Sequence, residues 1–427
     1  MTTTVPKRTL SVLMNALSSG VVPRRGLEYI AVGRKKETET FVSDLEDTAE
    51  GGGAFRFISG RFGNGKSFMI QMVRNYALDR GFVTMDADLS INRRLTGSKK
   101  EGLNTYMELI KTMAVKTRPD GGALEPMLEI VADGIVEDLK ASDMEIDQDS
   151  VFKKLTKMTE SMSAMQHYRD FIKMITSYCI DHASEKDDIP SVRWFKGEYD
   201  SKNEVKRDLE ISLLINDENW YDMIKLWAGF SRSVGYKGLV VFIDEGIVLY
   251  KLQSKQSRQN NYERLLTIFN DIMQGRSSYL SMYVCGTPEF IEDQNRGLYS
   301  YGALRSRLTT GRYENGYDNY LGPVINLRPL TNEELFVLLR TVKGLHEQRY
   351  DYTSEIDDQK METYLRSVIA NSVSPSLLTP REVTRDLISL LDTLHQNPGL
   401  RFDNLIHGRK VTPDADPADD IIEGLDI

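Results

Sequence analysis

Short apolar runs of strand length recur along the chain, and stretches with helical periodicity separate them. Strands of a buried parallel sheet are expected where a short run of positions is mostly apolar. Helices are expected where apolar residues return every three or four positions. Strands that alternate with helices predict an α/β fold with a parallel sheet covered on both faces. Five strands are predicted at 55–58, 82–86, 238–243, 281–286 and 323–327, and the main helices at 37–45, 68–78, 262–274, 335–345 and 379–394.

Residues 104–230 have almost continuous helical periodicity. Apolar side chains recur at three- to four-residue spacing, for example at Met107, Ile110 and Met113. We expect a long helical insertion between the second and third strands, with its methionines mainly in the core and not in a binding groove. Residues 118–150 carry ten acidic and two basic side chains, so this part is expected to face solvent and to be a poor surface for DNA.

The two ends of the chain differ in composition. A short helix is expected at 10–17, and Pro23 stops its continuation. Helical periodicity stops after 397–399, and residues 413–427 carry six acids and no base. We expect this acidic tail to be disordered. Its apolar tip, residues 421–427, is either a partner-binding element or part of an inert solubilising segment.

A glycine-rich segment follows the first predicted strand. Gly60, Gly65, Lys66 and Ser67 complete the pattern G-x-x-x-x-G-K-[ST]. Glycines let backbone N–H groups turn toward a phosphate, the lysine can reach the β- and γ-phosphates, and the serine hydroxyl can bind Mg²⁺. An unrelated glycine turn is the alternative, but the flanking strand and helix favour a P-loop NTPase that binds ATP and Mg²⁺. The other residues expected to bind the nucleotide here are Arg61, Phe62, Gly63, Asn64 and Phe68.

Polar residues end two of the predicted buried strands. Asp244 and Glu245 follow the third strand, the pattern of an aspartate that holds Mg²⁺ and a glutamate that orients the attacking water. An ordinary acidic pair on the surface is the alternative. Thr287 ends the fourth strand, where a hydroxyl can sense the γ-phosphate. Arg93, Arg94, Lys99 and Lys100 form a basic cluster after the second strand that either touches a phosphate backbone or is a solvated loop.

Composition limits the classes of function. The chain has 427 residues, 40% of them hydrophobic and 27% charged, with a net charge of −9, which argues against a protein that coats nucleic acid. Its two cysteines and five scattered histidines suggest no disulfide framework or metal site. No apolar run approaches the ~18 residues that span a bilayer. A signal peptide is not expected. Because two cysteines are too few for a disulfide framework, we predict a location in the reducing cytoplasm.

The order of these motifs resembles the AAA+ superfamily, particularly its origin-recognition-like branch. More narrowly, the chain resembles the BREX-system ATP-binding proteins of bacterial phage defence. The matching stretches are G-x-V-P-x-x-G-L-E-Y-I-A-V-G-R at 20–34, G-G-G-A-F-R-F-I-S-G-R-F-G-N-G-K-S-F at 51–68 and L-L-T-P-R-E-V at 377–383, and the resemblance covers roughly 10–395. The segments implied are 1–50 with a helix and an adenine-side loop, an AAA+ core at 51–330 with the insertion at about 104–230, a helical lid at 331–397 and the tail at 398–427.

The resemblance also implies roles for single residues. Gly33 and Arg34 would lie near the adenine, and Arg381 would be the lid arginine that reaches the phosphates of the same subunit. Arg305 and Arg307 are candidates for an arginine that acts on a neighbouring subunit's ATP. Because the family places that arginine in a Ser-Arg pair, Arg307 is favoured. The alternative is that both arginines pair with surface carboxylates.

Three functional classes remain open from the sequence. The first is an ATPase that forms homo-oligomers and works on or near DNA with other defence-system proteins. The second is a nucleotide-dependent switch or scaffold with little turnover, and the third is a DNA-independent remodelling or signalling ATPase. Origin-binding relatives carry a winged helix after the lid, whereas about 30 polar, acidic residues follow it here. Direct reading of DNA by that route is therefore not supported.

Overall fold

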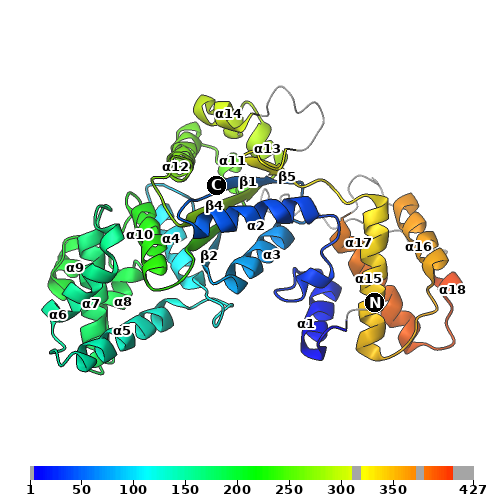
Figure 1. Cartoon of the computed structure of the whole chain (residues 1–427). Helices are drawn as coiled ribbons and strands as arrows, with labels where there is room; N and C mark the ends of the chain where they lie inside the picture. Colours follow the sequence, from blue (N-terminus) through cyan, green and yellow to red (C-terminus); the bar gives the residue numbers. More distant parts are fainter. Residues whose placement is uncertain (1–3, 310–318, 372–378, 407–427) are drawn as a thin grey trace. The chain divides into compact units, whose positions relative to one another are not determined.

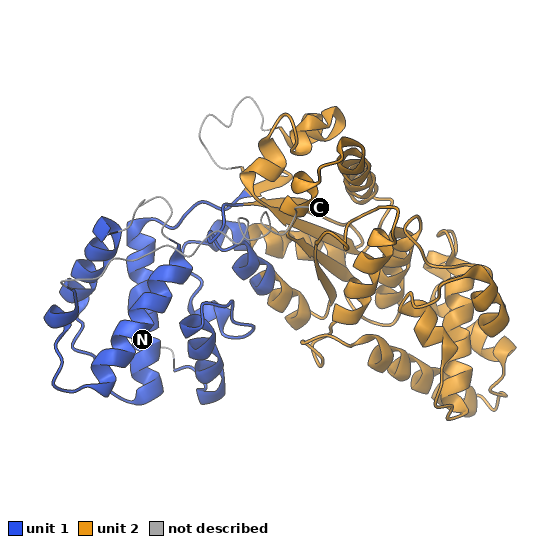
Figure 2. Ribbon diagram, turned by 180° about the vertical axis from the view of Figure 1, so that it is seen from behind, with its two compact units in different colours: residues 1–38, 60–72, 326–427 blue, residues 39–59, 73–325 orange. Residues whose placement is uncertain are grey.

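The computed structural model describes residues 4–309, 319–371 and 379–406. The chain forms two compact units, each built from separate stretches (Figure 2). The first unit comprises residues 1–38, 60–72 and 326–427, and the second comprises 39–59 and 73–325. The glycine-rich loop thus groups with both ends of the chain, and not with the strands. The four predicted segments divide the chain differently, and their boundaries stay a prediction.

A five-stranded parallel sheet lies at the centre of the second unit (Figure 1). Its order is β2-β3-β4-β1-β5, so each predicted strand is confirmed. The side chains of β3 and β4 are almost all buried, because both strands have neighbours on both sides and helices above and below. The strands are β1 (Phe55–Ser59), β2 (Val83–Asp88), β3 (Leu239–Asp244), β4 (Leu280–Gly286) and β5 (Val324–Asn326).

Helices connect these strands, as the periodicity predicted. The long helix α12 (Lys255–Met273) joins β3 to β4 and contacts β1. Its start is seven residues earlier than expected, because Ser254 caps the helix through a hydrogen bond to the Ser257 N–H. Further helices near the strands in the sequence are α2 (Lys35–Ala49), α3 (Lys66–Asp79), α11 (Ile247–Lys251), α13 (Pro288–Glu292) and α14 (Gly302–Leu308).

The predicted helical insertion is confirmed. Its core is aromatic: Phe171 lies with its ring centroid 5.0 Å from Trp227, 5.4 Å from Phe195 and 5.8 Å from Phe230. Met113 is fully buried, whereas Met107 is half-buried, so the methionine stripe belongs mainly to the core. The helices are α4 (Glu101–Thr112), α5 (Leu124–Ala141), α6 (Gln148–Met158), α7 (Tyr168–Ala183), α8 (Pro190–Phe195), α9 (Lys202–Leu209) and α10 (Trp220–Ser233).

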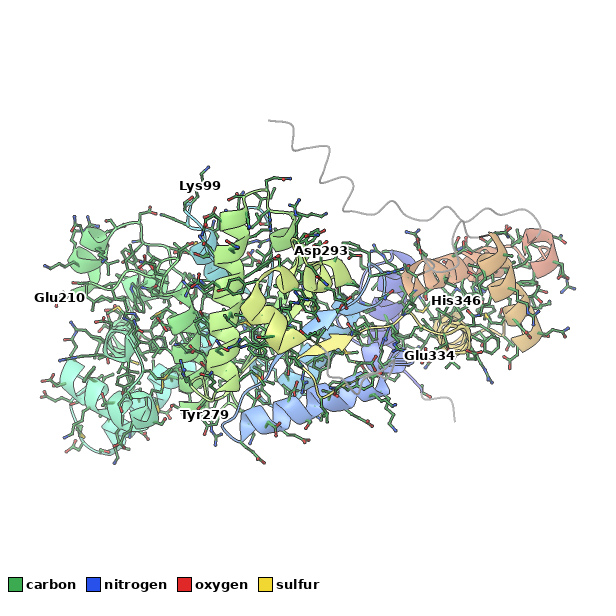
Figure 3. The ribbon with its side chains drawn as sticks, turned by 90° about the horizontal axis from the view of Figure 1, so that it is seen from above. Lys99, Glu210, Tyr279, Asp293, Glu334 and His346 are labelled. Carbon is green, nitrogen blue, oxygen red and sulfur yellow. The ribbon has the colours of Figure 1, made fainter. Side chains whose placement is uncertain are left out.

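Helices from both ends of the chain pack together in the first unit. The N-terminal helix α1 (Lys7–Ser18) contacts α15 (Asn332–Tyr350) and α17 (Pro380–Gln396). Thr331 and Thr379 start α15 and α17 with capping boxes. Figure 3 shows Glu334 and His346, both on α15.

Two helices of the first unit were not predicted. In the sequence, the helix α16 (Asp358–Asn371) follows α15 and precedes α17. The helix α18 (Phe402–Ile406) falls inside the segment assigned to the tail. Phe402 is 1% exposed, and its backbone N–H donates to the Glu355 carboxylate. Burial of this ring and the hydrogen bond hold α18 in place. The predicted disordered residues 413–427 lie outside the described residues. Within the described part of the chain, no helix has the length and apolar content that crossing a membrane requires.

A buried ion pair fixes α2 and the segment before β5 to the first strand. The Arg56 guanidinium donates to both carboxylate oxygens of Asp44, at 2.5 and 2.6 Å, and to the Gly322 carbonyl at 2.7 Å. The Asp44 side chain is only 4% exposed. Burial raises the pKa of Asp44, and the charge of Arg56 acts in the opposite direction. Removing either partner would leave the other charge buried and unpaired.

We predict that Arg56→Ala destabilises the second unit by about 3–5 kcal/mol, the usual cost of breaking a buried pair. Urea unfolding followed by tryptophan fluorescence measures the effect, since the insertion carries Trp194, Trp220 and Trp227. Arg207→Ala is the control, because Arg207 forms an exposed pair with its neighbour Asp208. A wild-type midpoint for Arg56→Ala would show that the network does not stabilise the fold.

Candidate functional site

The glycine-rich loop, residues 60–67, leaves the end of β1 and leads into α3. Gly63 and Gly65 have φ values of +79° and +89°, which residues other than glycine rarely adopt. The Lys66 ammonium turns back on this loop and donates to the carbonyls of Gly60 at 2.8 Å and Arg61 at 3.1 Å. The Phe62 ring centroid lies 5.0 Å from the same nitrogen.

Residues from both ends of the chain pack closely around this loop. A Cβ at Gly63 would lie 2.1 Å from the Thr379 Cγ2, and a Cβ at Gly33 would lie 2.5 Å from the Glu334 Oε1. Space as well as positive φ therefore requires glycine at 63, whereas at 33 the requirement rests on the positive φ, because the Glu334 carboxylate could shift. Arg381 lies in the same unit, with its Nε 3.1 Å from the Cβ position of Gly20. Gly33, Arg34, Arg381 and the loop thus belong to one compact unit, while their contacts with a nucleotide stay predictions.

The acidic candidates lie at the carboxyl end of the sheet in the second unit. Asp244 is the last residue of β3, and its Oδ1 accepts the Glu245 N–H at 2.8 Å. Glu245 has φ +58°, a left-handed conformation that is unfavourable for a residue with a Cβ. Gly246 then donates its N–H to the Cys285 carbonyl of β4 at 2.8 Å. The turn directs the chain away from β3 at the residue expected to act on water.

Thr287 follows β4 at the same edge. Because β3 and β4 are parallel and paired from Leu239 with Leu280 onward, their carboxyl ends are neighbours. Thr287 is 3% exposed, and its hydroxyl accepts the Phe290 N–H at 3.4 Å as the cap of α13. The hydroxyl keeps its own proton to donate. The second unit therefore places Asp244, Glu245 and Thr287 on adjacent strand ends.

The sequence analysis missed one carboxylate at this edge. Asp88 ends β2 in register with Asp244 of β3. Although part of Asp88 is exposed, the surrounding protein desolvates its carboxyl and raises its pKa, and the charge of Asp244 raises it further. The predicted strand stopped at 86, two residues before this position. An aspartate at the end of a strand next to Asp244 was the available signal.

The candidate arginines lie on the short helix α14. Both Arg305 and Arg307 are exposed. The Arg307 guanidinium donates to the Asn270 Oδ1 of α12 at 3.0 Å and to the Ala303 carbonyl at 2.8 Å. It is thus held by an amide and a carbonyl, and the expected action on a neighbouring subunit stays a prediction.

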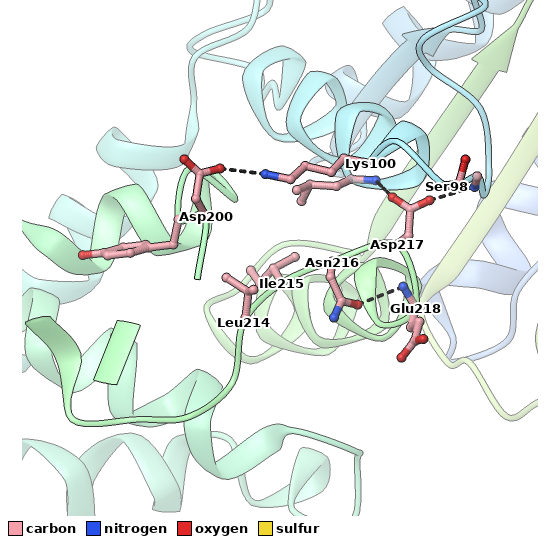
Figure 4. A pocket seen from close by; sticks show the side chains of 11 residues that line it. Ser98, Lys100, Asp200, Leu214, Ile215, Asn216, Asp217 and Glu218 are labelled. Atoms are coloured by element: carbon pink, nitrogen blue, oxygen red, sulfur yellow. Dashed lines mark hydrogen bonds and ion pairs between the residues drawn. The ribbon is translucent and has the colours of Figure 1, made fainter. Parts of the chain in front are cut away.

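The basic cluster after β2 is mostly paired within the chain. Arg93 contacts Glu108 at 3.0 Å, Arg94 pairs with Glu101, and Lys100 reaches Asp200 at 2.7 Å. Figure 4 shows the Lys100–Asp200 pair beside a cleft of about 280 Å³, where Asp217 accepts backbone N–H groups from the start of α4. These pairs favour the interpretation as a solvated loop over a surface for DNA phosphates.

A family model described as "BREX system ATP-binding protein BrxC/D" matches residues 5–410. It covers both units and all the candidate residues named above. No curated protein matches the chain.

Two substitutions of Glu245 can separate the effect of its backbone conformation on stability from the effect of its carboxylate. Glu245→Gly and Glu245→Ala both remove the carboxylate, but only glycine adopts φ +58° without strain. We therefore expect the glycine variant to be more stable than the alanine variant by about 1 kcal/mol. Paired urea unfolding curves measure this difference. Equal stabilities, or a more stable alanine variant, would mean that the left-handed turn is not present in solution.

Proposed function

The chain belongs to the BREX system ATP-binding protein family, and on this premise we propose that it binds and hydrolyses ATP in bacterial phage defence. One observation carries the proposal most directly. A G-x-x-x-x-G-K-S loop joins a buried parallel strand to a helix, and the next strands of the same sheet end in Asp244-Glu245 and Thr287. Phosphate loops and strand-end acids of this kind serve nucleoside triphosphate hydrolysis.

The loop is proposed to bind the phosphates of ATP. Its glycines leave backbone N–H groups accessible, and the start of α3 adds the positive end of a helix dipole. Lys66 donates to the Gly60 and Arg61 carbonyls in the structure. Phosphate oxygens are stronger acceptors for an ammonium than neutral carbonyls. Bound phosphate would therefore accept the N–H groups of Lys66 in place of these carbonyls.

The proposed metal ligands are Ser67 and Asp244, which supply a hydroxyl and a carboxylate. Such oxygens suit Mg²⁺, which keeps several waters and is completed by substrate phosphates. Among the described residues, no group of three or more His, Cys, Asp or Glu side chains could hold a metal ion. When bound, Mg²⁺ would neutralise charge on the transferred phosphoryl group.

Hydrolysis is assigned to Glu245, with Thr287 as a sensor. Glu245 has a left-handed backbone conformation, and its N–H donates to the Oδ1 of Asp244. Glu245 would then orient and polarise the attacking water. Thr287 would donate its hydroxyl proton to the γ-phosphate or to that water, which fits its position at the end of β4.

We further propose a homo-oligomer that works on or near DNA with other defence proteins. Arg307 is proposed to stabilise the transition-state charge in a neighbouring subunit, and Arg381 in its own. The pairing of the basic cluster and the acidic surface of α5 favour DNA association through partners over direct coating. A DNA-independent ATPase, or a switch with little turnover, are the other candidates. DNA-stimulated hydrolysis supports the first class, and turnover of the isolated protein separates the other two.

We predict that ATP binding and hydrolysis separate in two variants. Lys66→Ala should abolish tight ATP binding in calorimetry, since it removes the ammonium of the loop. Glu245→Gln should bind ATP normally and hydrolyse it on the order of 10²-fold more slowly, because an amide is not a general base. Unchanged affinity in Lys66→Ala would exclude this loop as the site. Normal hydrolysis in Glu245→Gln but not in Asp244→Asn would exchange the two acidic roles.

We also predict complementation between subunits. Arg307→Ala should bind ATP but lose about 10³-fold or more in rate, as expected for an arginine that stabilises phosphoryl transfer. Mixing it with Glu245→Gln protein should restore part of the turnover, because some interfaces then pair an intact site with an intact arginine. Arg305→Ala is the matched control on the same helix. Wild-type turnover in Arg307→Ala, or loss only in Arg305→Ala, would reject Arg307.

A further inference from the structure

Arg34 is buried at the start of α2, with 8% of its side chain exposed. Its Nη1 donates to the Glu37 Oε1 at 3.1 Å, which orients the guanidinium. Its Nη2 donates to two backbone carbonyls, that of Asn64 in the glycine-rich loop at 2.9 Å and that of Arg328 at 2.7 Å. All of these residues belong to the first unit. The planar fork of an arginine suits this set of fixed acceptors.

The carbonyls of Asn64 and Arg328 are both acceptors, so they cannot bond to each other. A shared positive donor lets them approach the same point without leaving either group unsatisfied. A second hydrogen bond joins the loop to the same segment, since the Asn64 Nδ2 donates to the Leu327 carbonyl at 3.0 Å. Two consecutive carbonyls of the segment between β5 and α15 thus hold one residue of the loop, through its main chain and its side chain.

Fixing the Asn64 carbonyl has a direct consequence for the next N–H. In a trans peptide unit the C=O and the N–H are coplanar and point in opposite directions. The carbonyl of Asn64 and the N–H of Gly65 belong to the same unit, so the bond from Arg34 directs the Gly65 N–H away from the guanidinium. Gly65 has φ +89° and little rotational restraint of its own. Without this bond, the peptide unit would be free to turn and lose the orientation of its donor.

We infer that Arg34 is a positioning residue for the phosphates, which it influences through the Asn64–Gly65 peptide unit and not by touching the adenine. The inference rests on the proposed function, because it assumes that the loop binds ATP. It revises the role expected from the family resemblance, which placed Arg34 near the base. It also makes the segment at 327–328 part of the phosphate site, because the same guanidinium holds that segment to the loop.

Two ligands distinguish the two roles of Arg34. Affinities for ATP and for inorganic tripolyphosphate, each with Mg²⁺, are measured by competition against a fluorescent ATP analogue in wild type and Arg34→Ala. We expect Arg34→Ala to weaken both ligands by the same factor, about tenfold or more, as for loss of a charged hydrogen bond. The matched control is Arg366→Ala, which removes an exposed arginine of α16 in the same unit and should change neither affinity.

Each remaining outcome contradicts the inference or the proposed function. Loss of affinity for ATP alone would mean that Arg34 contacts the nucleoside. Unchanged affinities, even with a lower melting temperature, would mean that Arg34 only supports the fold. If wild-type protein binds neither ligand, the proposed function itself is wrong, whereas normal wild-type binding with an unaffected Arg34→Ala rejects this inference alone.

A conservative variant, Arg34→Lys, tests the inference if Arg34→Ala does not fold. Arg34→Lys keeps the charge and can donate to one of the two carbonyls, but it lacks the planar fork. We expect Arg34→Lys to fold and to show a smaller loss that is again equal for ATP and tripolyphosphate. Glu37→Gln should weaken both ligands in the same direction, because it loosens the orientation of Arg34. Equal wild-type affinities in Arg34→Lys and Glu37→Gln would also overturn the inference.

Discussion

The parallel register of the sheet is the constraint on which the candidate chemistry depends. Pairing of β2 with β3 and of β3 with β4 places the carboxyl ends of all three strands at one edge. Asp88, Asp244 and Thr287 stand at that edge because each occupies the last position of its strand or the next one. A shift of one residue in any strand would turn these side chains to the opposite face, since strand side chains alternate. The buried apolar residues of β3 and β4 resist such a shift.

Two arginines join separate stretches of the chain through hydrogen bonds to backbone carbonyls. Arg56 joins β1 to Asp44 of α2 and to the carbonyl before β5, and Arg34 joins the glycine-rich loop to the carbonyl after β5. Both arginines are largely buried and bind a carboxylate as well as backbone groups. The short strand β5 is thus held on either side of its three residues. Arginine serves this purpose because one planar group satisfies several fixed acceptors.

Among the described residues, eight residues other than glycine have positive φ, and Glu245 is the one with a proposed role in phosphate chemistry. Glu245 adopts a left-handed conformation at the end of β3, and Gly63 and Gly65 adopt positive φ in the loop. Glycine makes such conformations inexpensive, but glutamate does not. The sheet and the bond from Gly246 to β4 over-determine the turn at Glu245.

The sequence by itself determined the five strands and the helical insertion, and it predicts the type of chemistry at the loop and at Asp244-Glu245. These follow from local signals: apolar runs, helical periodicity, capping residues and the spacing of glycines and lysine. It did not reveal the helices α16 and α18 or the bonds of Arg34, and Asp88 was missed although its position at the end of a strand was a local signal. The bonds of Arg34 depend on residues distant in sequence. Arg34 lies 30 positions from Asn64 and 294 from Arg328. Only the folded chain brings those carbonyls to one guanidinium, because no local pattern in the sequence relates residues so far apart.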